Sequence, residues 1–187
     1  MRLLRSYFNY MQNPTGRWTD LFDRASSAQA CAGYFVAALS WVIFFNLGDG
    51  ISLAALVFKL FFVFLAEVTA GYFIASLTAI YLSFRKIDVS ASTLFVLLGS
   101  AGFIKSLLIA WALLCAMFPS MHLNSCNALA LLLVFALQIL YLIAGLKQLV
   151  TLTSLGAFVA WGAGVVPGAV LLFVLGVFGI WGIALLF

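Results

Sequence analysis

Charged side chains are scarce in this 187-residue sequence, of which only 7% is Lys, Arg, Asp or Glu. A water-soluble domain carries roughly 25% charged residues, because its surface must be hydrated. Here hydrophobic residues make up 66% of the chain, and the mean hydropathy is +1.24. The composition therefore argues against a soluble globular protein and predicts an integral membrane protein with the lipid bilayer as its solvent.

Groups that commonly serve catalysis or metal binding are also few. The single histidine, His122, lies in a predicted loop, and Cys31, Cys115 and Cys126 lack the spacing of metal ligands. Phosphate-binding Gly-Lys-Ser/Thr loops, His-Glu-x-x-His and Cys-x-x-Cys are absent from the sequence. We therefore expect no enzyme, cofactor, metal or nucleic-acid partner, although a catalytic role confined to Glu67 stays open. The cysteines are expected to be small apolar fillers, with a Cys115–Cys126 disulfide as the alternative.

Long apolar stretches, separated by short polar connections, predict an all-α bundle of five transmembrane helices. About 20 apolar residues are needed to cross a bilayer as a helix. The spans are expected at about 28–47, 55–84, 94–118, 127–146 and 166–186. In the last of these, Pro167 would lie in the first turn, where its missing N–H costs little. Residues 156–164 would then form the approach to that span.

Residues 1–27 precede the first span and predict a cytoplasmic amphipathic lead. In residues 2–12, apolar side chains recur at helical spacing with Arg2 and Arg5 between them. This pattern is typical of a short helix lying in the headgroup plane. Asn13-Pro14 interrupts it, and residues 15–25 predict a second interfacial turn or helix.

The distribution of Lys and Arg predicts the orientation of the chain in the membrane. Seven of the nine basic residues precede the first span or follow the second and fourth, and the other connections carry none. Positive charge is retained on the cytoplasmic side. We therefore expect a cytoplasmic N-terminus and an external C-terminus, in a bacterial inner membrane or, in a eukaryote, in the Golgi or ER membrane.

Three charged residues interrupt the apolar stretches: Lys59, Glu67 and Lys105. Lys59 is near the outer end of its span and is expected to reach the interface. Glu67 and Lys105 lie near the centres of consecutive spans, where an isolated charge costs about 2.5–3.5 kcal/mol on insertion scales. We expect a midplane polar cluster of Glu67, Lys105 and Gln138, which Tyr141 could join. This cluster would fix helix register, or line a site for a substrate, ion or lipid headgroup; alternatively, Lys105 lies shallower and reaches the interface.

Glycines form another recurrent feature of the predicted third and fifth spans. Small residues let helices approach closely in a membrane. These glycines are Gly99, Gly102, Gly162, Gly164, Gly168, Gly176, Gly179 and Gly182. They predict helix packing within the chain, or else an interface with a second copy or another membrane protein.

Several segments, in their order along residues 14–186, resemble the Yip (Ypt-interacting protein) family of five-span membrane proteins. The segments are Asn13-Pro14 with WTDLF at 18–22, IYLSFR at 80–85, VSASTLF at 89–95, QILYLIAGLKQ at 138–148 and LTSLG at 152–156. The sequence departs from the family at 86–90, where KIDVS replaces a glycine-rich segment. The short N-terminal region is similar to that of the bacterial members. The resemblance implies the five-span topology and no site residues.

Two functions are compatible with these features. The first is a non-catalytic organiser of membrane or partner assemblies, as the Yip resemblance implies. The alternative is a transporter or channel subunit whose midplane polar site involves Glu67, Lys105 and Gln138. The alternative requires a water-accessible midplane, and it predicts a discontinuous helix near 99–102 or 162–168.

The predicted orientation can be tested with an epitope tag placed after Phe187. In spheroplasts of bacterial cells, we expect the tag to be accessible from outside, because the basic connections hold the opposite ends of the helices in the cytoplasm. Antibody binding before and after permeabilisation measures this accessibility. A tag that is accessible only from the cytoplasm contradicts the orientation.

Overall fold

The computed structural model describes residues 27–47, 52–121 and 123–184, apart from the side chains of residues 27, 124, 175 and 177–184. The regular structure within these ranges is helical. The four long helices are α3 (Ser27–Asn46), α4 (Leu53–Phe84), α7 (Asn127–Val150) and α8 (Ser154–Ala184). A further segment is built from α5 (Ala91–Ala101), the 3₁₀ helix η1 (Gly102–Ser106) and α6 (Leu107–Met117). The short 3₁₀ turns η2 (Pro119–Met121) and η3 (Leu123–Cys126) lead into α7.

Five segments of the described chain are long and apolar enough to cross a membrane. They are Ala28–Asn46, Leu53–Phe84, Ala91–Met117, Asn127–Val150 and Ser154–Val174. The predicted fold, an all-α bundle with five transmembrane helices, is therefore confirmed, and the chain is a polytopic helical membrane protein. The predicted amphipathic lead at 2–24 and His122 lie outside the described residues.

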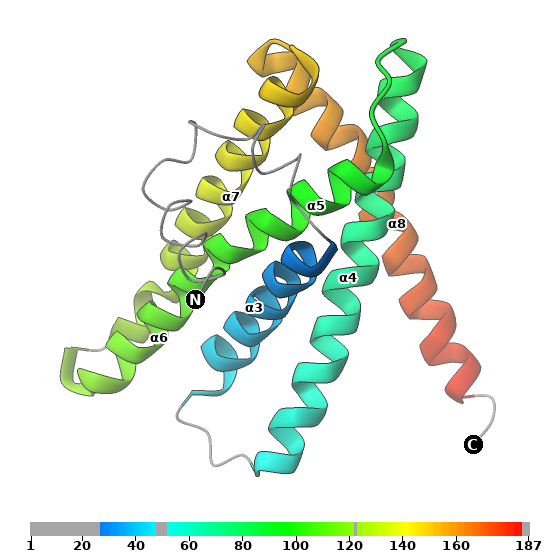
Figure 1. Cartoon of the computed structure of the whole chain (residues 1–187). Helices are drawn as coiled ribbons and strands as arrows, with labels where there is room; N and C mark the ends of the chain where they lie inside the picture. Colours follow the sequence, from blue (N-terminus) through cyan, green and yellow to red (C-terminus); the bar gives the residue numbers. More distant parts are fainter. Residues whose placement is uncertain (1–26, 48–51, 122, 185–187) are drawn as a thin grey trace.

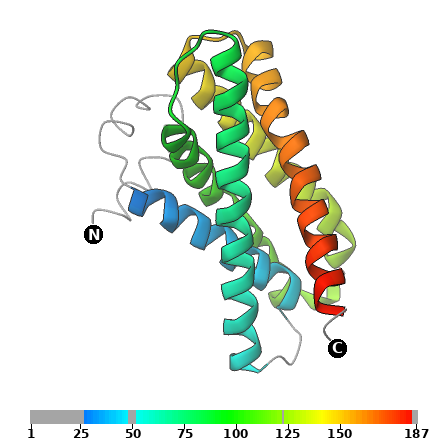
Figure 2. The same cartoon turned by 90° about the vertical axis from the view of Figure 1, so that its right-hand side faces the viewer.

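The helices form a bundle in which α4 is the longest element and lies at the centre of the view in Figure 2. The largest interface joins α4 to α8, which lies beside it in both views (Figures 1 and 2). Helix α3 is tilted across α4 and packs against α4, α5, η1 and α6. The α4–α5 and α7–α8 connections lie at the same end of the bundle.

The bundle is packed tightly at this end and more openly at the other. The hydrophobic core there includes Leu82 from α4, Leu94 and Leu97 from α5, Leu146 from α7 and Ala157 from α8. At the other end, the N-terminal half of α4 exposes most of its large apolar side chains, as expected of a lipid-facing surface. Because the helices separate away from the core, space is left between them at the middle of the bundle.

Close approach between helices depends on glycine at particular crossings. A Cβ atom at Gly33 of α3 would overlap the backbone carbonyl of Gly99 in α5, and one at Gly102 would lie 2.6 Å from the carbonyl oxygen of Gly33. At the α4–α8 crossing, a Cβ atom at Gly164 would lie 2.8 Å from the carbonyl oxygen of Ile74. The predicted packing role within the chain thus holds at Gly99, Gly102 and Gly164. Gly162 and Gly176 have no such neighbour within 4 Å, and the surroundings of Gly179 and Gly182 are not described.

The predicted start of the fifth span is wrong. Helix α8 begins at Ser154 rather than near residue 166, so the expected approach at 156–164 is already helical and Pro167 lies inside the helix. The Thr153 hydroxyl accepts a hydrogen bond from the Gly156 N–H (3.1 Å), which caps the first turn. Proline is tolerated inside a transmembrane helix because neighbouring structure compensates for the missing backbone hydrogen bond.

Other helices also extend beyond the predicted spans. Helix α4 begins two residues earlier because the Ser52 hydroxyl accepts a hydrogen bond from the Ala55 N–H (3.3 Å). The Ser90 hydroxyl similarly accepts from the Thr93 N–H (3.1 Å) at the start of α5. Helix α7 continues to Val150, where Thr151 adopts a left-handed backbone conformation (φ 49°) and ends it.

We expect Gly33→Ala to destabilise the fold, because the added methyl group forces α3 and α5 apart at a backbone-to-backbone contact. Overpacking of this kind costs about 1–3 kcal/mol. The midpoint of unfolding by SDS of the purified protein in mild detergent measures the loss. Gly162→Ala is the matched control, since no heavy atom lies within 4 Å of the new Cβ atom. Equal losses for the two variants would contradict the proposed helix contact.

Candidate intramembrane binding site

A partly open cavity of about 900 Å³ lies between the helices of the bundle. Its walls come from α3, α4, α5, η1, α7 and α8. Most of its lining is apolar, and it includes Phe62, Ile74, Phe135, Ile139 and Val165. The volume falls in the range of about 300–1,000 Å³ that is typical of small-molecule sites.

Among the residues that the structure describes, Glu67 of α4 and Lys105 of η1 are the only charged groups that line this cavity. Lys105 Nζ lies 2.6 Å from Glu67 Oε1, so the two residues form the contact that the sequence predicted. Their side chains are 9% exposed for Lys105 and 19% exposed for Glu67. Two opposite charges that are largely removed from solvent stabilise each other, whereas either one alone would carry a large desolvation cost.

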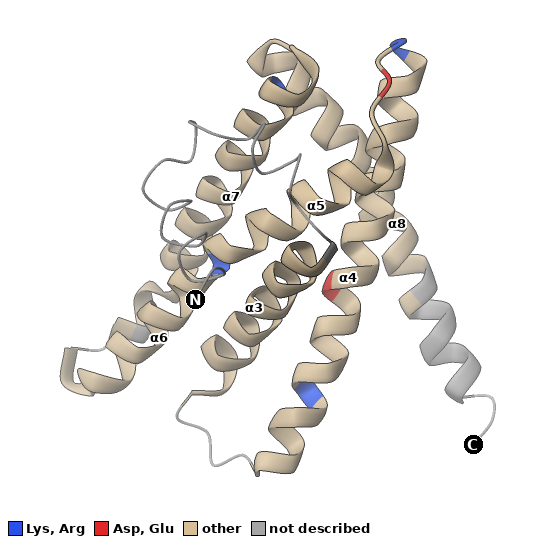
Figure 3. Ribbon diagram, in the orientation of Figure 1, with Lys and Arg blue, Asp and Glu red and all other residues tan. Residues whose placement is uncertain are grey.

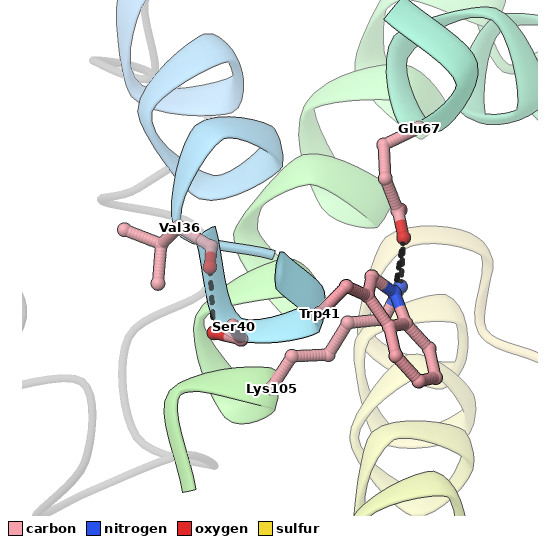
Figure 4. A network of polar contacts seen from close by, with 5 residues as sticks. All are labelled: Val36, Ser40, Trp41, Glu67 and Lys105. Carbon is pink, nitrogen blue, oxygen red and sulfur yellow. Dashed lines mark hydrogen bonds and ion pairs between the residues drawn. The ribbon is translucent and has the colours of Figure 1, made fainter. Parts of the chain in front are cut away.

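Trp41 of α3 completes this arrangement, and sequence analysis missed it. The Trp41 indole N–H donates a hydrogen bond to the same Glu67 Oε1 atom (2.7 Å). Lys105 Nζ lies 5.3 Å from the centre of the Trp41 ring, within the range of a cation–π interaction. Figure 4 shows the Lys105 side chain extending beside Trp41 toward the Glu67 carboxylate. The carboxylate thus ties three consecutive membrane segments together.

The 3₁₀ helix η1 carries Lys105 between α5 and α6. A 3₁₀ turn is tighter than an α-helical turn, and a mid-helix stretch of it often marks a functional site or strain. The transporter or channel alternative predicted a discontinuous helix near 99–102. The segment Ala91–Met117 is continuously helical there, and it tightens to a 3₁₀ helix only from Gly102 to Ser106. The other proposed location, 162–168, is continuous helix within α8.

The remaining predicted polar residues have different surroundings. Gln138 of α7 lines the same cavity as Glu67 and Lys105. Tyr141, one turn further along, is buried in the hydrophobic core instead. Tyr34 of α3 also lines the cavity, and its hydroxyl donates to the Phe95 carbonyl oxygen (3.1 Å).

Lys59 lies apart from this pair, in the second turn of α4 near the α3–α4 connection. Figure 3 shows that the blue and red positions along α4 are well separated. Lys59 Nζ donates to Asn46 Oδ1 at the end of α3 (2.6 Å). By contrast, Arg85, Lys86 and Lys147 lie at or near the connections of the opposite end. These three basic residues are therefore gathered at one end of the bundle, at or near the ends of α4 and α7.

Cys31, Cys115 and Cys126 are free thiols in the structure, so the alternative disulfide between Cys115 and Cys126 is not formed. Cys31 and Cys126 are exposed rather than buried. Within the described ranges, no group of three or more His, Cys, Asp or Glu side chains is placed to hold a metal ion. The site is thus an ion pair and an indole on the wall of an apolar cavity.

Comparison of the chain with protein-family models, with curated proteins and with solved structures gives no match. The resemblance to the Yip family therefore has no support from these comparisons.

We expect Lys105→Met to lower stability sharply, because Glu67 keeps only the Trp41 donor. Removing one partner of a buried ion pair costs about 3–5 kcal/mol, and partial exposure to the cavity places this pair toward the lower value. SDS unfolding of the detergent-solubilised protein measures the change. The double variant Lys105→Met/Glu67→Leu should recover much of the loss, because no unpaired charge is left.

Lys59→Met is the control for this prediction, because Lys59 is exposed and its partner Asn46 is neutral. We expect it to change stability by no more than about 1 kcal/mol. If Lys105→Met unfolds at the same SDS concentration as the unmodified protein, the pair does not stabilise the bundle.

Proposed function

We propose that this protein is a non-catalytic transporter or carrier that binds an amphipathic molecule at the Glu67–Lys105 pair. One observation carries the proposal: the pair lies on the wall of a large cavity between the helices. Ionisable residues within the membrane are costly, and where they persist they commonly mark substrate or ion pathways.

The composition of the cavity supports an amphipathic substrate. A mainly apolar wall accommodates hydrocarbon, whereas a few convergent polar groups orient one polar end. Glu67, Lys105 and Gln138 provide those polar groups here. A mid-helix 3₁₀ stretch often marks a functional site, and η1 places such a stretch beside the cavity.

The second candidate is the Yip-like organiser of membrane or partner assemblies. It is favoured by the mutual satisfaction of Trp41, Glu67 and Lys105, which pair with one another and need no ligand. In this case the ion pair only fixes how three helices pack, and the cavity is filled by lipid. The two candidates therefore differ in whether water reaches the cavity.

Water access can be tested at Gln138. In a chain whose three native cysteines are replaced by serine, we expect Gln138→Cys to react with a membrane-impermeant, charged thiol reagent. The reaction requires a hydrated thiol, which a cavity connected to the aqueous phase provides. Labelling of the protein in proteoliposomes, followed by mass spectrometry, measures it.

Leu137→Cys is the matched control, because Leu137 is the neighbouring residue, is 46% exposed and does not line the cavity. In the bilayer its thiol should face lipid and stay unlabelled. If Gln138→Cys is as unreactive as Leu137→Cys, the cavity is not hydrated and the organiser becomes the better interpretation.

A further inference from the structure

A second, smaller cavity of about 280 Å³ adjoins the first between α3 and the N-terminal half of α4. Its lining includes Phe45, Asn46 and Lys59 near the α3–α4 connection. Trp41, Phe62 and Val63 line both cavities and therefore form their common wall. The two cavities lie in series, from the end of the bundle that carries Lys59 to the Glu67–Lys105 pair at its middle.

Among the described residues that line the two cavities, positive charges outnumber negative ones. Lys59 and Lys105 contribute two positive charges, and Glu67 contributes the one negative charge among the residues that line the two cavities. The hydrogen-bond partner of Lys59, Asn46, is neutral, so the charge of Lys59 is not compensated by it. A monovalent anion entering from the Lys59 side would make the combined net charge zero. A cation would raise it and meet two ammonium groups.

We propose that the two cavities are the access route and binding site of an amphiphile with one anionic head group and an apolar chain. This inference rests on the proposed function and specifies its substrate class. Lys59 attracts the head group at the end of the bundle, and Lys105 holds it at the Glu67–Lys105 pair. The chain then lies against the apolar wall formed in part by Phe135 and Ile139.

The hydrogen bonds of the pair allow Lys105 to turn from Glu67 to an arriving anion. Glu67 accepts from two donors, Trp41 Nε1 and Lys105 Nζ, both at the Oε1 atom. When Lys105 turns to an arriving anion, Glu67 keeps the Trp41 N–H, so its carboxylate does not lose every donor. A charge-assisted hydrogen bond from Lys105 to the new anion replaces the one that it releases.

A photoreactive probe tests this inference on the full chain in nanodiscs of phosphatidylcholine. The probe is a palmitic acid analogue with a diazirine on its chain, used in mildly alkaline buffer that keeps its carboxyl group ionised. The matched probe is a hexadecylamine with the same diazirine. We expect saturable labelling of α4 and α7 residues that line the cavities by the acid, blocked by excess palmitate, and at least tenfold weaker labelling there by the amine.

Variants separate head-group recognition from folding. Lys59→Gln, at an exposed position, should weaken labelling by the acid by about two- to fivefold, the scale of an exposed charge interaction. Lys86→Gln is the matched control with no effect, since Lys86 lines neither cavity. Phe62→Trp places a larger side chain between the two cavities and should reduce labelling of the residues that line the larger one. Phe61→Trp should not, because Phe61 is 59% exposed and lines neither cavity.

The possible outcomes distinguish this inference from the function on which it rests. Equal saturable labelling by the acid and the amine would overturn anion selection and leave a cavity that binds amphiphiles. Unchanged labelling in both Lys59→Gln and Phe62→Trp would overturn the access route. No saturable labelling of the cavity by the acid would overturn the substrate class, while the reactivity of Gln138→Cys would still report whether the cavity is hydrated.

Discussion

The contact between Glu67 and Lys105 is the constraint on which the middle of this bundle depends. Neither charge is stable alone in hydrocarbon, so the helices that carry them must meet. Trp41 joins the same carboxylate oxygen from a third segment, and this fixes the relative positions of α3, α4 and η1. The pair therefore holds three membrane segments together and is also the polar centre of the cavity.

The helices pack closely on one side of the Glu67–Lys105 pair and more loosely on the other, and this asymmetry creates the cavity. On the side of the α4–α5 and α7–α8 connections, leucines and alanines from four helices form a continuous core. On the other side, α4 turns large apolar side chains outward. Lipid solvates these apolar surfaces as well as another helix would, so no strong force draws the helices together there. The cavity with Glu67 and Lys105 on its wall lies where the two regions meet.

The binding role that we propose for the pair depends on its position at the wall of the cavity. A structural pair would be most effective if sealed between helices, whereas this one remains partly exposed to a space large enough for a small molecule. The 3₁₀ stretch in the third membrane segment places Lys105 beside that space. A second cavity with its own lysine adjoins it. These features motivate the proposed access route, along which positively charged side chains outnumber negatively charged ones.

The sequence by itself determined that the chain lies in a bilayer, that five helices cross it, and that Glu67 and Lys105 belong together. Long uncharged stretches and the cost of isolated charges are sufficient for these conclusions, because both depend on composition and spacing alone. Only the tertiary structure decided that Trp41 shares the carboxylate, because the tilt of α3 across α4 sets which side chains meet. It also decided that α8 begins at Ser154, where capping by Thr153 and a continuous apolar run outweigh the signal of Pro167. The cavity could not be predicted for the same reason: empty space depends on how far helices diverge, and no residue pattern encodes that distance.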